Sequence, residues 1–309
     1  MNTPEFSLII TTYNSSRTID QALKSVENLE DAKNIEVIIS DDASQDDTVG
    51  HITAWAHRCN DIFNNIIVIP NEVNLGIAGN HTLAFGCATA AFGTYIGGDD
   101  YFIRPDFFRN LRRHIDSNLK IAKTDLISIF EETGAAIPTF HEVARFFAYP
   151  LPMQKRLMCL VGNVIAGGPG TILHIPTLKQ LGYFGKEIRV FEDFQVYLSF
   201  LFAGYRIRML PVQGIAWRRH LGSLSYSQKE RMHEAQGAIY NTYIRPHLPR
   251  LPYITRSLTK LRYAFPTGIW VKLFCPLWWG HLLHVFLREA REPTSTLKSS
   301  EPKILDIEA

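Results

Sequence analysis

The sequence contains few of the features that mark several common protein classes. Only four cysteines occur among 309 residues, and no two of them form a CxxC pair. This pattern excludes a zinc ribbon and argues against a disulfide framework, so we expect a reducing compartment. The N-terminus lacks a basic stretch followed by an apolar core, and we therefore expect no signal peptide. The net charge is only +2, which gives no overall attraction to nucleic acid.

Two glycine-rich signatures of phosphate binding are also absent. No GxGxxG follows the first expected strand, and GxxxxGK[ST] occurs nowhere in the chain. A dinucleotide-dependent enzyme is therefore disfavoured. If the protein binds phosphates, we expect a metal ion to hold them in place of a glycine-rich loop.

The sequence does contain a regular alternation of apolar runs and helical patterns. With 46% hydrophobic and 20% charged residues, the chain is apolar enough to fold. Short apolar runs alternate with stretches such as 19–26, whose apolar residues recur at helical spacing. The expected strands are residues 6–10, 35–39, 66–69, 94–96, 125–130 and 206–210. Because the first strands are apolar on both faces, we predict an α/β fold with a mostly parallel central sheet flanked by helices.

Polar residues follow the expected strands at the point where each strand ends. Asp41 and Asp42 follow the second strand, and Asp99 and Asp100 follow the fourth. Ligands of open α/β sheets bind beyond these carboxyl ends. Carboxylates that converge there repel one another unless a cation lies between them, and oxygen ligands suit Mg²⁺ or Mn²⁺. The sequence therefore predicts a divalent cation at this edge.

Four segments resemble, in order, the motifs of family 2 glycosyltransferases. They are FSLIITTYN at 6–14, VIISDDAS at 37–44, NLGIAGN at 74–80 and GDDYFIRP at 98–105. Glu-Asp at 192–193 and Arg-Arg-His at 218–220 follow, so the resemblance extends over residues 5–222. It implies the GT-A fold and an inverting, metal-dependent transfer from a sugar nucleotide.

The resemblance assigns donor-binding roles to residues of the first motifs. Thr11 and Tyr13 correspond to residues that line the nucleoside. Asp42 corresponds to the carboxylate that accepts a hydrogen bond from the base, which suits the imide N–H of uracil. Asn80, which closes the third motif, is also expected to bind the donor.

The metal motif of the family, D-x-D, falls on residues 98–100 here. Asp100 matches the metal-binding second aspartate. Gly98 replaces the first one, so its contact with metal or ribose is either missing or supplied by Asp99, which we assign to donor binding. The resemblance also makes His220 a metal ligand, with Arg218 as a nearby donor-binding cation.

The catalytic base implied by the resemblance is Asp193, just before an expected helix over 194–202. An inverting transfer requires one carboxylate to take the proton of the acceptor hydroxyl while its oxygen attacks the anomeric carbon. The loop at 167–170, Gly-Gly-Pro-Gly, is interpreted either as an acceptor-side loop or as plain turn chemistry.

Several of these residues also have purely structural interpretations. Asp42 and Asp193 could each cap a helix, because a carboxylate near a helix N-terminus is favourable. A lone histidine such as His220 is often structural.

Two other functions also remain open. A nucleotidyltransferase would need a basic, glycine-rich loop, whereas residues 11–17 hold one arginine and no glycine. A catalytically inactive nucleotide-binding protein would need Asp42 but not Asp193.

The C-terminal part differs in charge from the rest of the chain. Residues 245–291 contain eight lysines and arginines and one acid, a balance of +7. They include the tryptophan-containing run 268–287, which we interpret as an interfacial helix on an anionic membrane, with a buried core helix or a membrane span as alternatives. We therefore expect a basic, aromatic helical extension and a cytoplasmic protein on the inner face of the cell membrane.

The expected organisation has four parts. Residues 1–105 form the nucleotide-sugar-binding half, residues 106–222 the acceptor-binding and catalytic half, residues 223–292 the helical extension, and residues 293–309 a flexible tail. The predicted function is transfer from a UDP-sugar to a saccharide or lipid-linked saccharide, as in bacterial surface polysaccharide synthesis.

Overall fold

The buried strands expected from the sequence form the first half of one central sheet. The computed structural model describes residues 3–140, 143–165, 167–185, 188–219 and 229–264. The order of the strands is β3-β2-β1-β4-β8-β6-β9-β5, and β7 pairs with β6. The strands are β1 (Phe6–Thr12), β2 (Ile35–Asp41), β3 (Asn65–Pro70), β4 (Phe92–Gly97), β5 (Tyr101–Phe102), β6 (Ile121–Phe130), β7 (Ala136–Pro138), β8 (Thr171–His174) and β9 (Arg208–Arg219).

The pairing of the strands confirms the α/β prediction. β1 lies parallel to both β2 and β4, and β2 lies parallel to β3. Every residue of β1 and β2 is buried, as continuous apolar runs predict. The second half of the sheet is mixed, because β8 runs antiparallel to β4 and β6, whereas β9 runs parallel to β6.

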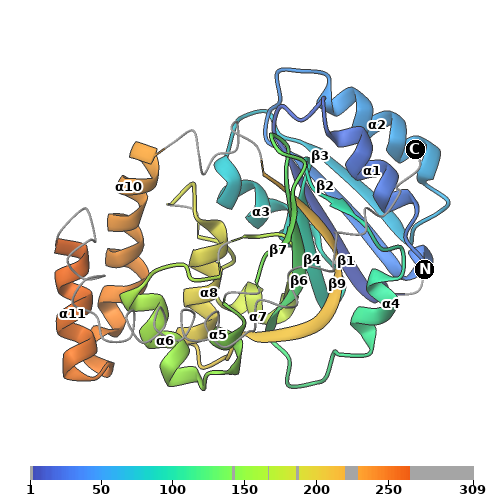
Figure 1. Ribbon diagram of the computed structural model, residues 1–309. Helices are drawn as coiled ribbons and strands as arrows, with labels where there is room; N and C mark the ends of the chain where they lie inside the picture. The colour runs from blue at the N-terminus through green and yellow to red at the C-terminus, as the bar shows by residue number, and fades with distance from the viewer. Residues whose placement is uncertain (1–2, 141–142, 166, 186–187, 220–228, 265–309) are drawn as a thin grey trace.

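Helices cover both faces of the sheet. Figure 1 shows α1, α2 and α4 on one side of the sheet and α3 and α8 on the other. Figure 1 also shows α10 and α11 farther out, beyond α6 and α8. The helices are α1 (Ile19–Glu27), α2 (Thr48–Cys59), α3 (Gly76–Cys87), α4 (Phe107–Arg112), α5 (Ala144–Ala148), α6 (Leu151–Leu160), α7 (Ile175–Gln180), α8 (Glu192–Phe202), α10 (Lys229–Ile239) and α11 (Tyr253–Ala264).

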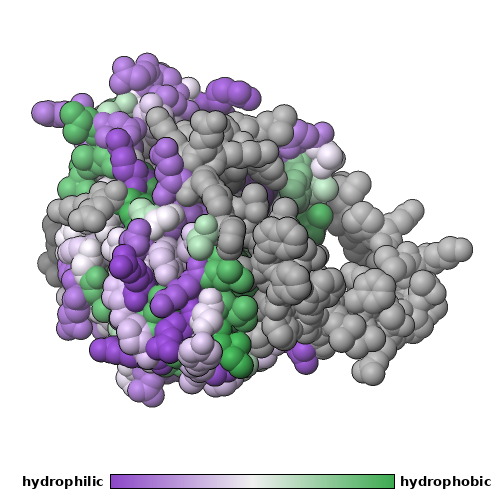
Figure 2. Space-filling model, turned by 90° about the vertical axis from the view of Figure 1, so that its left-hand side faces the viewer, coloured by the Kyte–Doolittle hydropathy of each residue, from purple (hydrophilic) through white to green (hydrophobic). Residues whose placement is uncertain are grey.

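The outermost helix, α11, has apolar residues on its exposed side. Tyr253 and Ile254 are 73% and 71% exposed, whereas Thr255 and Thr259 are buried. Figure 2, which views the molecule from the side of α10 and α11, shows hydrophobic and hydrophilic residues mixed on this surface. Among the described helices none is long and apolar enough to cross a membrane. The predicted interfacial segment 268–287 and the predicted tail 293–309 lie outside the described residues.

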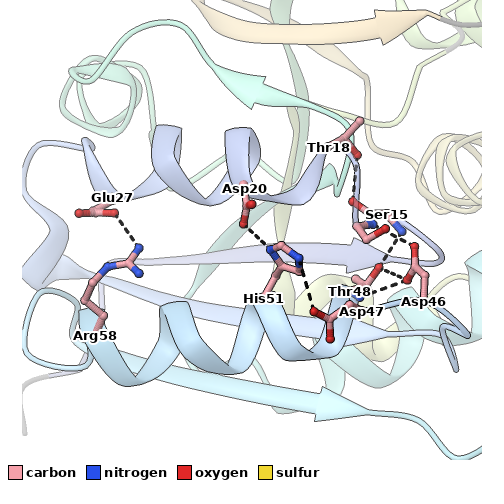
Figure 3. Close-up of polar contacts among 10 residues, drawn as sticks. Ser15, Thr18, Asp20, Glu27, Asp46, Asp47, Thr48, His51 and Arg58 are labelled. Carbon is pink, nitrogen blue, oxygen red and sulfur yellow. Dashed lines mark hydrogen bonds and ion pairs between the residues drawn. The ribbon is translucent and has the colours of Figure 1, made fainter. Parts of the chain in front are cut away.

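Polar pairs on the surface connect α1 with α2 (Figure 3). The His51 ring lies 2.8 Å from Oδ1 of Asp20, and this hydrogen bond raises the pKa of His51. Arg58 of α2 lies 3.4 Å from Glu27 of α1. Because these pairs are solvent-exposed, each contributes little to stability.

A buried carboxylate stabilises the edge of the sheet opposite the polar strand ends. Glu36 is 1% exposed. It accepts hydrogen bonds from the Ser7 hydroxyl (2.5 Å), from the amide and hydroxyl of Thr89 (2.6 and 2.9 Å) and from the Ala90 amide (3.0 Å).

We expect Glu36→Ala to lower the free energy of unfolding by about 3 kcal/mol, because buried donors lose their acceptor. Urea unfolding measures this change. Glu72→Ala, on the surface, is the control and should change stability by less than about 0.5 kcal/mol; an equal effect of both variants would contradict the expectation.

Candidate active site

The carboxyl ends of β1, β2 and β4 meet at one edge of the sheet. The Asp42 amide donates to the Thr12 carbonyl at 2.8 Å, and the Gly98 amide donates to the Thr11 carbonyl at 2.9 Å. The segments that follow these strands, which contain most of the predicted site residues, are therefore held side by side. The predicted convergence at the sheet edge is confirmed for the loops after β1, β2 and β4.

The two aspartates after β2 have different surroundings. The Asp41 carboxylate accepts from the Thr12 hydroxyl (2.7 Å) and from the Ser44 amide and hydroxyl (2.8 and 2.6 Å). Asp41 therefore links the loops that follow β1 and β2. The Asp42 carboxylate accepts from the backbone amides of Leu75 (2.6 Å) and Gly76 (2.9 Å), where α3 begins. Asp42 thus makes the helix-capping contact that was one of its two interpretations.

The loop capped by Asp42 is held from its other side by Arg189. The Arg189 guanidinium donates to the Asn74 carbonyl (2.6 Å) and side-chain oxygen (2.7 Å). Gly76 has a φ of +75°, a conformation that favours glycine. This arrangement fixes the short backbone segment between β3 and α3.

The other predicted donor-binding residues of this edge differ in exposure. The Tyr13 ring is 51% exposed and is available to a ligand, whereas Thr11 is 9% exposed. Asn80 is buried, and its amide group exchanges hydrogen bonds with Ser40 at 2.5 and 2.9 Å. Its oxygen also accepts from Asn71 at 3.0 Å. In this structure Asn80 therefore supports the end of β2 from within the core.

Asp99 and Asp100 form a turn at the end of β4. Oδ2 of Asp100 accepts from the Gly97 amide at 2.9 Å, and its Oδ1 accepts from the Arg218 amide at 3.1 Å. A β-carbon at Gly97 would lie 2.5 Å from Oδ1 of Asp99 and 3.2 Å from Oδ2 of Asp100, so both carboxylates flank this glycine. Burial and the negative charge of Asp99 raise the pKa of Asp100 well above its ordinary value.

This pair has the chemistry of a site for a divalent cation. Two adjacent carboxylates repel each other, and a hard cation with oxygen ligands relieves that repulsion. The part of the chain that the structure describes contains no group of three or more His, Cys, Asp and Glu residues placed to hold a metal ion. Diphosphate oxygens and water commonly complete such sites. The predicted ligand His220 lies outside the described residues.

The packing around Gly98 accounts for the departure from D-x-D. A β-carbon at Gly98 would lie 2.8 Å from the Thr12 methyl group and 3.0 Å from the Ser15 hydroxyl. An aspartate at this position would require the segment after β1 to move. A side chain at position 98 would therefore displace Thr12 at the end of β1 or Ser15 in the loop that follows, and a glycine avoids this contact.

Arg218 lies next to the aspartate turn and binds it. Its Nε donates to the Asp99 carbonyl at 2.9 Å, and its Nη1 donates to Glu131 at 2.6 Å. Its Nη2 donates to Gln21 of α1. The guanidinium therefore holds the aspartate turn in place, a role that the motif pattern did not predict. Glu131 and Gln21 had no recognisable signal in the sequence.

Asp193 lies in the first turn of α8 and is 7% exposed. Its Oδ2 accepts from the Asn163 side chain (2.9 Å) and the Gly167 amide (3.1 Å), and its Oδ1 accepts from its neighbour's amide, that of Phe194, at 2.7 Å. Burial raises the pKa of Asp193, whereas these hydrogen bonds lower it. The carboxylate is held rigidly and is more basic than a solvated aspartate. Asn163 was not identified from the sequence.

Glu192 precedes Asp193 and lies against the loop 167–170. A β-carbon at Gly168 would lie 3.1 Å from its Oε1. Burial and the neighbouring Asp193 raise the pKa of Glu192 to about 8. The negative charge of either carboxyl group therefore opposes ionisation of the other.

Comparison with known proteins identifies the family and the fold of the chain. The family described as Glycosyl transferase family 2 matches residues 7–171. The Escherichia coli protein WfaP, a "UDP-Glc:alpha-D-GlcNAc-diphosphoundecaprenol beta-1,3-glucosyltransferase", is 25% identical over 248 residues, which cover 78% of this chain and 88% of WfaP. The chain spans 34% of the length of an "Uncharacterized glycosyltransferase" of Haemophilus influenzae and 43% of the length of one S. aureus TarS chain.

Two solved structures share the fold. S. aureus TarS 1-349 in complex with UDP-GlcNAc superposes with a TM-score of 0.64 at 19% identity, covering 87% of this chain and 74% of that one. The Pyrobaculum calidifontis mannosyltransferase PcManGT in complex with GDP-Man and Mn²⁺ gives 0.61 at 17% identity, covering 96% and 84%. At these identities the likeness concerns the fold, and it confirms the predicted GT-A architecture.

Proposed function

The chain belongs to glycosyl transferase family 2, and we propose that it is an inverting enzyme that moves a sugar from a UDP-sugar to a saccharide or lipid-linked saccharide. The observation that carries this proposal is the separation of two carboxylate sites with different surroundings. Asp99 and Asp100 lie side by side at the end of β4, whereas Asp193 lies at the start of α8, where Asn163 and the Gly167 amide hold it. The first suits a metal–diphosphate complex, and the second suits a base.

The donor is proposed to bind across the ends of β1 and β2. The exposed Tyr13 ring, beside Thr11, would lie against the nucleoside. A carboxylate has about four lone-pair positions. The two amides that bind Asp42 therefore leave it able to accept the imide N–H of uracil. The printed names of WfaP and of the TarS complex, which contain UDP-Glc and UDP-GlcNAc, favour the same nucleotide.

In the proposed mechanism Asp193 takes the proton of the acceptor hydroxyl as its oxygen attacks the anomeric carbon, and the nucleoside diphosphate leaves from the opposite face. Asn163 and Gly167 orient the Asp193 carboxylate for this step. Asp99 and Asp100, with His220, would hold Mn²⁺ or Mg²⁺, which when bound neutralises charge on the leaving diphosphate. Asn80 and Arg218 support this site by fixing the ends of β2 and β4.

A panel of nucleotide-sugars tests the proposed function. We expect diphosphate release from a UDP-sugar in the presence of an acceptor and Mn²⁺ or Mg²⁺. Release only from donors with another base would contradict the proposed role of Asp42. Binding of UDP without release from any donor would favour the inactive nucleotide-binding protein.

We also propose that the C-terminal part binds an anionic membrane surface. The exposed Tyr253, Ile254 and Leu261 of α11 lie on the same helix as Arg256 and Lys260. This combination of apolar and basic groups suits a lipid headgroup region. A lipid-linked acceptor, as in the printed name of WfaP, would be presented at such a surface.

Binding to vesicles tests the membrane proposal. Each basic residue near an anionic surface contributes about 1 kcal/mol to membrane binding, and salt screens this electrostatic contribution. Salt does not screen the contribution of aromatic side chains that are buried in the headgroup region. We therefore expect high salt to weaken binding to anionic vesicles, and deletion from Thr267 onward to weaken it further, because α11 and its exposed apolar residues remain in the shortened protein. The truncated protein should still act on a soluble acceptor, which is the control. A full-length protein that does not bind anionic vesicles would contradict the proposal.

A further inference from the structure

Lys123 of β6 is a lysine with no exposed surface in the core of the protein. Its ammonium group donates to the carbonyls of Gly167 (2.6 Å) and Pro169 (2.8 Å) and to the Thr171 hydroxyl (3.0 Å). An ammonium group has three N–H donors, and these contacts use all of them. Burial of a charge is costly, so a lysine at this position requires an explanation beyond packing.

The loop that Lys123 binds is the same loop that orients Asp193. Gly167 accepts from Lys123 through its carbonyl and donates to Asp193 through its amide, at 3.1 Å. The Tyr197 hydroxyl, from the same helix as Asp193, donates to the Gly167 carbonyl at 3.1 Å. Gly167 has a φ of +110°, so its conformation depends on these anchors. Gly167 therefore forms hydrogen bonds with both the Lys123 ammonium group and the Asp193 carboxylate.

The charges around Lys123 belong to the candidate active site. Burial lowers the pKa of Lys123 to about 7, whereas Asp193, Glu192 and Asp100 raise it. In turn, Lys123 is among the groups that lower the pKa of Asp193. The buried hydroxyls that face this cluster, those of Tyr95 and Tyr197, have pKa values raised well above their ordinary value and stay neutral.

We propose that Lys123 is a positioning residue for the transfer reaction: it fixes the loop 167–171 that orients Asp193, and its positive charge keeps Asp193 ionised. The inference rests on the proposed function, because it assigns Lys123 a role through the base. It explains why the amino group of a lysine is buried beneath a loop of backbone carbonyls. It also gives the Gly-Gly-Pro-Gly segment a part in positioning the base.

The test compares pH–rate profiles of Lys123→Met and Lys123→Gln with that of the wild type. Loss of the ammonium removes a charge that favours the ionised base, so the acidic limb of kcat/KM should move to higher pH by about one unit. We expect kcat at neutral pH to fall roughly 10²-fold, since misplacement of a catalytic group has effects of this size. The KM of the donor should change little. A residue with only a structural role would not move the acidic limb.

Lys120→Met is the matched control, because Lys120 also belongs to this part of the chain but donates to the Ser117 carbonyl (3.2 Å), outside the cluster. It should keep the wild-type profile. Lys123→Gln retains an amide donor, so it is expected to fold even if Lys123→Met does not. An unmoved acidic limb in the folded Lys123 variants, or unfolding of both, would overturn the proposal.

Asp193→Asn in the same series separates this inference from the proposed function. If Asp193→Asn is inactive while the Lys123 variants keep the wild-type limb, only the role of Lys123 fails. If Asp193→Asn is fully active, or if the wild type transfers no sugar, the proposed function fails instead.

Discussion

We expect Asp193→Asn to lower the turnover of sugar transfer by roughly 10²-fold or more while UDP-sugar binding stays close to that of the wild type. General-base catalysis contributes effects of this size, and an amide cannot take the proton of the acceptor hydroxyl. The bonds around Asp193 explain why the loss should be large. Asn163, Gly167 and Phe194 all donate to the carboxylate, which is thereby held in one orientation.

The same donors make a control for folding necessary. An asparagine turns an amide group toward at least one N–H donor, so thermal unfolding must be measured beside turnover. Glu192→Gln is the matched variant, because it neutralises the adjacent carboxyl, whose pKa is raised to about 8 by burial and by Asp193. It should retain most of the activity at neutral pH. Near-normal turnover of a folded Asp193→Asn protein would refute the assignment of the base.

Removal of the divalent cation is the second change with a large expected effect. We expect a chelator to lower transfer by roughly 10²-fold or more, because a metal ion contributes several kcal/mol to stabilisation of the leaving charge. Asp100→Ala should weaken UDP-sugar binding when Mn²⁺ or Mg²⁺ is present and have little effect in its absence. Calorimetric titration of the donor with and without the cation measures both effects.

A matched control for Asp100→Ala is Asp116→Ala, which removes an aspartate that pairs with Arg208 on the surface. It should leave the metal dependence of donor binding unchanged. Wild-type donor binding that is indifferent to chelator would contradict a metal site at Asp99 and Asp100. In that case Gly98, which replaces the first carboxylate of the motif, would account for the loss of metal affinity.

The first four strands could be predicted from the sequence because each contains a short apolar run, although only β1 and β2 are buried along their whole length and β3, at the edge of the sheet, is half-buried. Such strands are continuous apolar runs, and their ends coincide with polar motifs. β5, β7 and β9 were harder to predict. β5 and β7 are short, and β5 pairs with the distant β9. β9 itself contains Pro211 and Gly214, which interrupt the apolar pattern. The expected strand 206–210 therefore covers only the beginning of β9.

The residues of the candidate site likewise divide into those that could be predicted from the sequence and those that could not. Asp42, Asp99, Asp100 and Asp193 could be located because their motifs have a fixed order. The partners that hold them could not, since a hydrogen bond from Lys123 to a carbonyl leaves no sequence signature. A predicted role in binding the sugar nucleotide also does not show which residues of the folded protein the side chain contacts. Asn80, for example, bonds to Ser40 in the core.

The most direct measurement is acceptor-dependent release of UDP from a UDP-sugar by the wild type and Asp193→Asn, side by side, with and without Mn²⁺. We predict rapid release by the wild type with Mn²⁺, strong loss without the cation, and loss of release in Asp193→Asn despite retained UDP binding. Equal release by the two proteins, or release that needs no cation, would contradict a metal-assisted transfer in which Asp193 is the base.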